Sequence, residues 1–347
     1  MTAGRIERLR ERLEGRLLVT NLQNVRYLTG LDSSNAALLV RPGGEATLFT
    51  DFRYVESARA IDGVELEMTK RALMRDVGER LTGRVQFEAD VLPYAEWERL
   101  STGTAELVPT SGIVAAVRAI KDEEEVAKLQ KAARIADRAL EALTAETWVG
   151  RSEKEVAWRL HELCHAHGAD DIAFESIVAS GPRGALPHGR PTDAIIERGT
   201  LVTIDWGAKV DGYYSDCTRT FSTGSLPDRL REIYAVCLDA QKKAMATVKA
   251  GITGVAADAV ARDVIEAAGY GENFGHGLGH GVGLAVHEAP RLSTESPDTL
   301  EPGHCVTVEP GIYLPGEGGV RIEDLAIVRE GGVDVLTSFP KELVEVS

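Results

Sequence analysis

Glycine occupies every odd position of the run from Gly275 to Gly283, and two of the even positions between them are His276 and His280. So many glycines would be costly in a helix and weak in a strand, so the run is expected where the backbone must approach another group closely. In an extended chain successive side chains point to opposite faces, which places both histidines on one face. A flexible linker is the alternative, but linkers rarely interleave histidine and branched apolar residues so regularly. The run therefore predicts a site.

Length and charge limit the kinds of protein that this chain can be. Its 347 residues exceed the usual size of one hydrophobic core, so two domains are expected. The net charge of −15 argues against nucleic acid and against an anionic membrane as partners, because both need a concentrated positive face. No apolar stretch is long enough to span a bilayer, and the arginine- and glutamate-rich amino terminus lacks a targeting core. Four scattered cysteines suit buried thiols in a reducing compartment, so a cytoplasmic location is expected.

The first part of the chain alternates short apolar runs with turn signals. Residues 17–19, 36–40 and 46–49 are strand-like, and residues 41–44 have the composition of a turn. This pattern predicts a small α/β domain over residues 1–118.

Helix signals then open the second part, residues 119–347. Residues 122–125 are all acidic and precede a long segment with helical apolar spacing, as the helix dipole favours at a first turn. A second helix is predicted from Ser152, which opens a capping box, and a third over about 229–248. Strands and turns dominate after about Thr200, which is typical of an α+β domain.

Two aspartates lie in a predicted hairpin. Asp205 belongs to an apolar segment, residues 201–207, and Asp216 ends the returning segment, residues 213–216. The two residues are symmetric about the turn. If the turn centre shifts by one residue they become diagonal neighbours, still on one face. Either register brings the two carboxylates together.

A second predicted hairpin repeats this arrangement with glutamates. Glu309 ends the ascending segment, and Glu323 is its mirror image across a glycine-rich turn. Arg321 lies two residues before Glu323, and Tyr313 lies four residues after Glu309. Regular pleating would aim both side chains at the face that carries the acids.

Four acids within apolar strands require an explanation. Asp and Glu are disfavoured in strand interiors, and a single one is best explained as a residue on the wet side of a sheet or in a salt bridge. Two symmetric pairs beside a glycine-framed histidine are better explained as one site. Converging carboxylates raise one another's pKa, so such a site needs cations. Two divalent ions would balance the four charges, and oxygen ligands with one imidazole suit Mn²⁺, Co²⁺ or Zn²⁺.

A separate segment, residues 161–165, fits the H-E-x-x-H pattern of zinc proteases. The predicted helix phase argues against that function, because it leaves His161 and His165 on the exposed side. No third ligand is obvious from the sequence. The apolar stripe of this helix is instead formed by Val156, Leu160 and Leu163.

Six motifs together resemble one family, the metallopeptidases of the pita-bread fold, and within it the Xaa-Pro peptidases, prolidase and aminopeptidase P. The resemblance extends from about Arg118 to the carboxyl terminus, and the preceding segment resembles the small creatinase-type domain. It implies an α+β chain with a creatinase-like domain over residues 1–118 and a pita-bread catalytic domain over residues 119–347. The motifs are residues 204–207, 215–220, 276–284, 287–288, 308–311 and 320–324.

The resemblance implies a set of metal ligands. Asp205 and Asp216 would bind one ion, and Asp216 and Glu323 would bridge to a second ion that also takes His280 and Glu309. A hydroxide between the ions would be the nucleophile, because metal binding brings the pKa of water toward neutrality. Glu309 would also take the proton of the water and pass it on.

Other residues resemble groups that act on the substrate. His188 and His287 resemble the histidines that hold the substrate carbonyl and the tetrahedral intermediate. His276, Arg321 and Tyr313 would shape the pocket for the proline side of the substrate.

The resemblance implies hydrolysis of the peptide bond that precedes proline. Xaa-Pro dipeptides are the expected substrates, with two divalent ions, Mn²⁺ first and Co²⁺ or Zn²⁺ as alternatives, in a homodimer. Aminopeptidase P, which acts on longer Xaa-Pro-Yaa peptides, is the alternative activity. Methionine aminopeptidase usually lacks a histidine at the place of His276, and creatinase lacks the metal set. A non-catalytic pita-bread binding protein would be expected to have lost ligands, and all five are present.

Overall fold

The computed structural model describes residues 2–347, which divide into two compact units with the boundary between Arg118 and Ala119. The amino-terminal unit contains a six-stranded mixed sheet in the order β4-β3-β2-β1-β5-β6. Its strands are β1 Leu17–Val19, β2 Ala36–Val40, β3 Ala46–Thr50, β4 Val64–Met68, β5 Arg84–Glu88 and β6 Glu106–Thr110. Its helices are α1 Thr2–Arg10, α2 Leu22–Thr29, α3 Val55–Ala58, α4 Leu73–Arg80, α5 Tyr94–Leu100 and α6 Ile113–Ala119. The three strands predicted in this region are confirmed.

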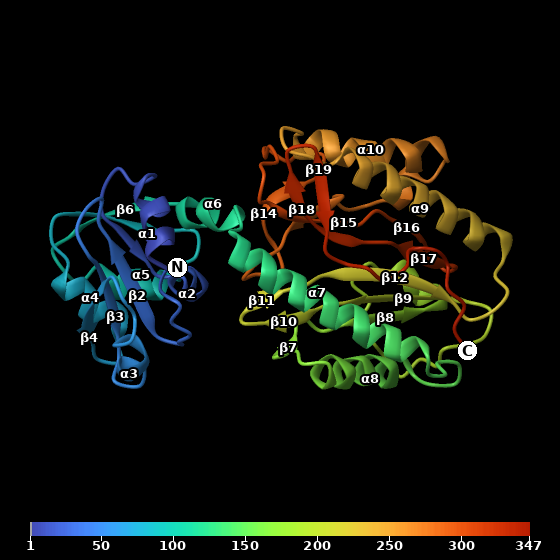
Figure 1. The fold of residues 1–347 in the computed structure, drawn as a ribbon, viewed down its shortest axis with the longest axis horizontal. Helices are drawn as coiled ribbons and strands as arrows, with labels where there is room; N and C mark the ends of the chain where they lie inside the picture. Colours follow the sequence, from blue (N-terminus) through green and yellow to red (C-terminus); the bar gives the residue numbers. More distant parts are fainter. Residues whose placement is uncertain (1) are drawn as a thin grey trace. The chain divides into compact units, whose positions relative to one another are not determined.

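Two helix pairs frame the second unit. Figure 1 shows α7 and α8 along one side of its sheets and α9 and α10 along the other. Capping boxes begin α7 and α8 at Asp122 and Ser152, which confirms both predicted helix starts. The helices are α7 Glu123–Thr144, α8 Glu153–Ala166, α9 Asp228–Thr247 and α10 Gly254–Ala267, with short 3₁₀ turns η1 Gly181–Ala185 and η2 Gly271–Asn273.

Four small sheets lie between these helix pairs. Their orders are β11-β10-β7, β12-β9-β8, β14-β13-β15-β18-β19 and β16-β17. The strands of the first two sheets are β7 Asp171–Ile172, β8 Ile177–Ser180, β9 Leu201–Trp206, β10 Ala208–Val210, β11 Tyr213–Tyr214 and β12 Cys217–Ser222. Those of the other two are β13 Gly279–Gly281, β14 Glu288–Leu292, β15 Cys305–Val308, β16 Gly311–Leu314, β17 Gly318–Arg321, β18 Asp324–Arg329 and β19 Gly332–Val335.

Each helix pair covers its own hydrophobic core, and strand alternation divides the side chains between core and site. On β9, Ile204 and Trp206 pack with α7 and α8, and the Trp206 Nε1–H donates to the Ala136 carbonyl. On β15, Val306 and Val308 pack with α9 and α10. Residues between these apolar positions point the other way, toward the space between the two cores.

Both predicted hairpins have a pairing that the sequence allowed, and each is divided into two ladders. In the first, Asp205 pairs with Thr218, which is the shifted register that makes Asp216 a diagonal neighbour. In the second, Val308 pairs with Asp324 and Gly311 with Arg321, so Glu309 and Glu323 lie opposite one another between two separate ladders. The predicted symmetry of Glu309 and Glu323 is therefore confirmed, although the hairpin is divided into two ladders. Pro310 explains the break, because proline has no N–H to donate to a ladder.

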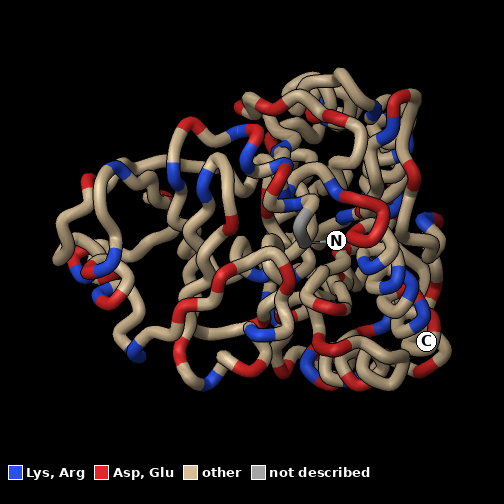
Figure 2. Tube along the Cα trace, turned by 60° about the vertical axis from the view of Figure 1, so that its left-hand side comes forward, with Lys and Arg blue, Asp and Glu red and all other residues tan. Residues whose placement is uncertain are grey.

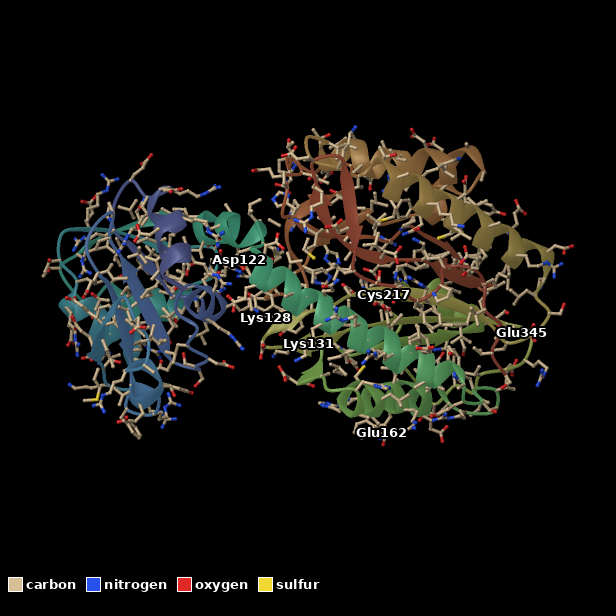
Figure 3. The ribbon with its side chains drawn as sticks, in the orientation of Figure 1. Asp122, Lys128, Lys131, Glu162, Cys217 and Glu345 are labelled. Atoms are coloured by element: carbon tan, nitrogen blue, oxygen red, sulfur yellow. The ribbon has the colours of Figure 1, made fainter. Side chains whose placement is uncertain are left out.

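The cysteines have the buried positions that the sequence predicted. Figure 2 shows acidic and basic residues interspersed along the chain. All four cysteines are free and buried, and Figure 3 shows Cys217 among the strands of the second unit. Within residues 2–347, no helix combines the length and apolar character needed to cross a membrane.

Candidate metal centre

The structure brings the five predicted ligands together between the two cores. The candidate ligand atoms of Asp216, His280 and Glu323 all lie within 4.8 Å of one another. His280 Nε2 is 3.6 Å from Asp216 Oδ2 and 3.2 Å from Glu309 Oε1. Asp205 joins the group through Arg321, whose Nη2 is 2.7 Å from Asp205 Oδ2 and whose Nε is 4.0 Å from Glu309 Oε2.

Two buried carboxylate oxygens at this centre are left without a hydrogen bond. Among the groups of residues 2–347, none donates to Asp205 Oδ1 or Glu323 Oε1. Burial of a charged oxygen without a partner is costly, so these atoms require a cation or a proton. The donor set, four carboxylates and one imidazole, is one that divalent metal ions accept. The residues therefore fit a metal centre.

The pKa values of the carboxyl groups in the metal-free protein also indicate that this centre requires a cation. Burial, followed by the charge of Glu323, raises the pKa of Asp216 well above its ordinary value. Burial, followed by the charge of Glu309, does the same to the pKa of Glu323. Burial also raises the pKa of Asp205, against the opposing charge of Arg321. Without a bound cation, these carboxyl groups would therefore tend to be protonated.

His280 and Glu309 form the exception, because they neutralise each other. Burial would lower the pKa of His280, but the contact with Glu309 outweighs burial and raises it. Burial would raise the pKa of Glu309, but His280 and neighbouring cations hold it at about 2. The His280 Nδ1–H donates to the Gly281 carbonyl at 3.1 Å, so Nε2, which faces Glu309, is the ring nitrogen that can bind a metal in place of a proton.

Two threonines support the ligands, and the sequence reasoning missed both. The Thr218 hydroxyl donates to Glu323 Oε2 at 2.8 Å, and the Thr307 hydroxyl donates to Glu309 Oε1 at 3.1 Å. Thr218 follows Asp216 by two residues and Thr307 precedes Glu309 by two. The same-face spacing that selected Arg321 could therefore have found them.

The predicted substrate residues form a chain of hydrogen bonds beside the ligands. The Arg321 Nη1 donates to the Tyr313 hydroxyl at 2.9 Å and to the Pro187 carbonyl at 3.1 Å. The Tyr313 oxygen is 2.9 Å from His276 Nε2, and His276 Nδ1 is 2.8 Å from the Gly277 carbonyl. A neutral His276 that donates from Nδ1 and accepts from Tyr313 satisfies every contact, and burial lowers its pKa accordingly.

The two predicted catalytic histidines lie at the edge of this group and are exposed. The His287 ring lies 4.3 Å from that of His280, centroid to centroid. Burial, followed by the charge of His280, lowers the pKa of His287, so its neutral form is favoured. His188 follows Pro187, the residue whose carbonyl Arg321 binds, which fixes the backbone next to it.

The glycine run permits the close approaches that its composition predicted. A Cβ at Gly279 would lie 2.1 Å from the Thr307 carbonyl oxygen, and one at Gly281 would lie 2.2 Å from that of Ala289. A Cβ at Gly283 would lie 2.3 Å from the Glu288 carboxylate, which also pairs with Lys121 at 2.6 Å. Only Gly279–Gly281 of the run is a strand, so the extended segment is shorter than expected.

The fold and the site define a metal-dependent hydrolase of the pita-bread class. Residues 127–330 match the model of metallopeptidase family M24, and residues 5–120 match the creatinase/prolidase N-terminal domain. The chain belongs to metallopeptidase family M24, with a creatinase-type domain before the catalytic domain. The expected fold class is thereby confirmed.

Relatives match over nearly the whole chain. An Xaa-Pro dipeptidase of Pyrococcus horikoshii is 40% identical, over 94% of this chain and 94% of that protein. A solved structure of an Xaa-Pro dipeptidase from Bacillus anthracis is 42% identical, covers 100% of both chains and has a TM-score of 0.96. The structure of an X-Pro aminopeptidase from Thermotoga maritima is 34% identical, over 98% of this chain and 100% of that one, with a TM-score of 0.89.

Proposed function

We propose that this protein hydrolyses the peptide bond preceding proline in Xaa-Pro dipeptides. The observation that carries the proposal is the buried group of Asp205, Asp216, His280, Glu309 and Glu323, in which two carboxylate oxygens have no protein partner. Relatives named Xaa-Pro dipeptidase, at 40% and 42% identity, support the substrate class. A non-catalytic role is disfavoured because the ligand set is complete.

Two divalent ions bound by these residues would offset the carboxylate charge and lower the pKa of a water toward neutrality. Asp216 and Glu323 are proposed to be among the residues that would hold these ions, because each is nearly without exposed surface and burial raises the pKa of each. The Thr218 and Thr307 hydroxyls hold Glu323 and Glu309 in place through their hydrogen bonds. The ligands are therefore oriented before metal arrives, which reduces the cost of reorganisation.

Glu309 is proposed as the proton acceptor. An ionised carboxylate can accept the proton, and the Glu309 Oε1 is already oriented by the Thr307 hydroxyl. His287 and His188 are proposed to donate hydrogen bonds to the substrate carbonyl as its oxygen gains charge. A neutral His287 keeps one ring N–H for this purpose.

The pocket for proline is proposed to be formed by His276 and Tyr313, with Arg321 behind them. The rings of His276 and Tyr313 are 5.5 Å apart, and Phe274 packs edge-on against His276 at 5.0 Å. These rings offer an apolar surface, which suits a substrate nitrogen that carries no hydrogen. Arg321 is proposed to hold Tyr313 in place, because four of its five N–H groups are already bound within the protein.

A comparison of two substrates tests the proposed activity. We expect a higher kcat/KM for an Xaa-Pro dipeptide than for the same peptide extended by residues after proline. The opposite order would favour the alternative, aminopeptidase P, which the similarity to the Thermotoga maritima X-Pro aminopeptidase keeps open. No hydrolysis of either peptide by the metal-loaded protein would contradict both activities.

We further propose Mn²⁺ as the metal, with Co²⁺ or Zn²⁺ as alternatives, a homodimer as the assembly and the cytoplasm as the location. The oxygen-rich ligand set favours a hard ion. Metal analysis of protein purified from its native host, together with light scattering for mass, would test the first two. Cell fractionation would test the third.

A further inference from the structure

A second cluster of possible ligands lies at the carboxyl end of α8, away from the centre described above. His161 and His165 are one helical turn apart, and their Nε2 atoms are 3.0 Å from each other. His165 Nε2 is also 3.9 Å from Asp171 Oδ1. One ligand atom from each of the three residues lies within 4.8 Å of the other two. Asp171 is the third ligand that the sequence did not reveal.

All three residues belong to elements held in place by the fold. The face of α8 opposite the histidines is buried through Val156 and Leu160. The helix ends in a Schellman motif, in which Gly168, at φ +98°, lets the Ala169 N–H reach the Cys164 carbonyl at 3.0 Å. This motif sets the direction in which the chain leaves α8.

The same loop is fixed at its other end by a sheet. Asp171 begins β7 and pairs with Lys209 of β10. The Asp170 N–H donates to the Lys209 carbonyl at 2.9 Å. The Ile172 N–H donates to Asp171 Oδ1 at 2.8 Å, which orients the carboxylate. The cluster is therefore positioned before any ligand binds, which favours affinity.

We propose that His161, His165 and Asp171 bind one divalent transition-metal ion, of the class of Zn²⁺ and Cu²⁺, at a site separate from the catalytic centre. Two imidazoles and one carboxylate favour such borderline ions more than the oxygen-rich centre does. Tetrahedral coordination with Zn–N bonds of about 2.0–2.1 Å places two ligand nitrogens about 3.3 Å apart. The rings must therefore separate by only a few tenths of an ångström.

Metal binding also sets the tautomer of both rings. In the absence of metal, one Nε2 donates to the other across the 3.0 Å contact. Both Nε2 atoms must present lone pairs to a metal, so both rings then carry their proton on Nδ1. The bound ion would tie the end of α8 to β7, and solvent would complete its coordination, because His165 and Asp171 are exposed.

The site is not that of a zinc protease, despite the H-E-x-x-H spacing. In that chemistry the glutamate acts as a general base at the metal. Here Glu162 is engaged elsewhere, since Oε1 accepts from Trp158 Nε1 and Oε2 from Arg159 Nη1, both at 3.0 Å. Figure 3 shows Glu162 at the outer side of α8. We assign the site to binding and not to hydrolysis.

Trp158 supplies a local probe for the test. Its ring lies 5.0 Å from that of His161, and its side chain is 62% exposed. Cu²⁺ bound at His161 would therefore quench Trp158 fluorescence. The Mn²⁺-loaded protein should be titrated with Cu²⁺, and the Trp158→Phe variant identifies the part of the quenching that comes from this residue. Zn²⁺ bound first should raise the Cu²⁺ concentration needed for quenching, because both ions compete for the same ligands.

The expected result is that the part of the quenching that depends on Trp158 saturates as a single site. His161→Ala and His165→Ala should each raise the Cu²⁺ concentration at half-quenching by about a hundredfold, because the second imidazole binds as part of a chelate. His167→Ala is the matched control, since His167 is an exposed neighbour outside the cluster and should leave the titration unchanged. Peptidase activity of all three variants should equal that of the wild type.

Two outcomes would overturn the proposal. One is that His161→Ala and His165→Ala give the same titration as His167→Ala. The other is that Trp158→Phe shows the full wild-type quenching, which would place the bound Cu²⁺ elsewhere. Neither outcome depends on whether the protein is an Xaa-Pro dipeptidase.

Discussion

Replacing Arg321 with lysine separates two roles that this residue could have at the site. Its guanidinium donates to Asp205, Thr218, Tyr313 and the Pro187 carbonyl, at 2.7 to 3.1 Å. Lysine keeps the charge but has three N–H donors on one nitrogen and cannot reach groups that the planar fork spans. The change therefore tests geometry and leaves the net charge unaltered.

The contacts give the expected size of the effect. Loss of two of these hydrogen bonds, at a net value of about 1 kcal/mol each, amounts to about 2 kcal/mol. Arg321 binds the metal ligand Asp205 directly and reaches the ligand Glu323 through the Thr218 hydroxyl. If these bonds serve to hold the two ligands, metal affinity should fall about 30-fold. This value lies within the range of about 10–100-fold that is typical for partners of metal ligands. At saturating metal, KM for an Xaa-Pro dipeptide should change less than threefold.

Calorimetric titration of the metal-free protein with Mn²⁺, followed by kinetics at saturating Mn²⁺, would measure both quantities. Arg329→Lys is the control, because Arg329 pairs with Asp334 at the surface, away from the ligands. An unchanged Mn²⁺ affinity together with a large rise in KM would refute the reasoning. Arg321 would then contact the proline directly, as the sequence alone predicted.

Three further results are expected. Chelation should abolish activity and Mn²⁺ or Co²⁺ should restore it, with Asp216→Ala losing both ions in metal analysis; full activity without metal would contradict the dinuclear centre. His188→Ala and His287→Ala should each lower kcat by about a hundredfold or more at unchanged metal content, and loss of metal in either would make it a ligand. His304 has its pKa lowered to about 4 by burial, so the unfolded chain binds a proton first as the pH falls below about 6.5. This group should therefore make the free energy of unfolding in urea about 2 kcal/mol lower at pH 5 than at pH 7. The difference should be missing in His304→Asn, which keeps an acceptor for the Glu301 N–H. Equal pH profiles for the two proteins would contradict the prediction.

Much of the site followed from the sequence because strand pairing is set by local rules. Symmetry about a turn placed Glu309 opposite Glu323, and the two open registers for Asp205 and Asp216 differed by a step that preserves the face. A capping box likewise predicted the start of α8, and the acidic residues 122–125 predicted that of α7. These features depend on residues close in the chain or on a two-residue period.

What the sequence did not predict depends on contacts between distant segments. The Arg321 bond to the Pro187 carbonyl links residues 134 positions apart, and no local pattern indicates it. The breaks at Glu309 and Glu323 arise where Pro310 leaves the ladder and the Glu323 N–H binds Thr218 instead. Asp171 was missed because the Schellman turn that returns it to α8 is defined by tertiary packing as much as by Gly168.

The two separate cores have a consequence for how this unit unfolds. Asp205 and Asp216 are attached to the core of α7 and α8, whereas His280 and Glu309 are attached to the core of α9 and α10. Ions held by all four residues join the two cores in the native state only, so metal binding should couple their melting. Calorimetry should therefore show a broad or double transition in the metal-free protein and a single, sharper one after loading. The carboxylates that hold the metal would then act as a cross-link that makes two cores melt as one.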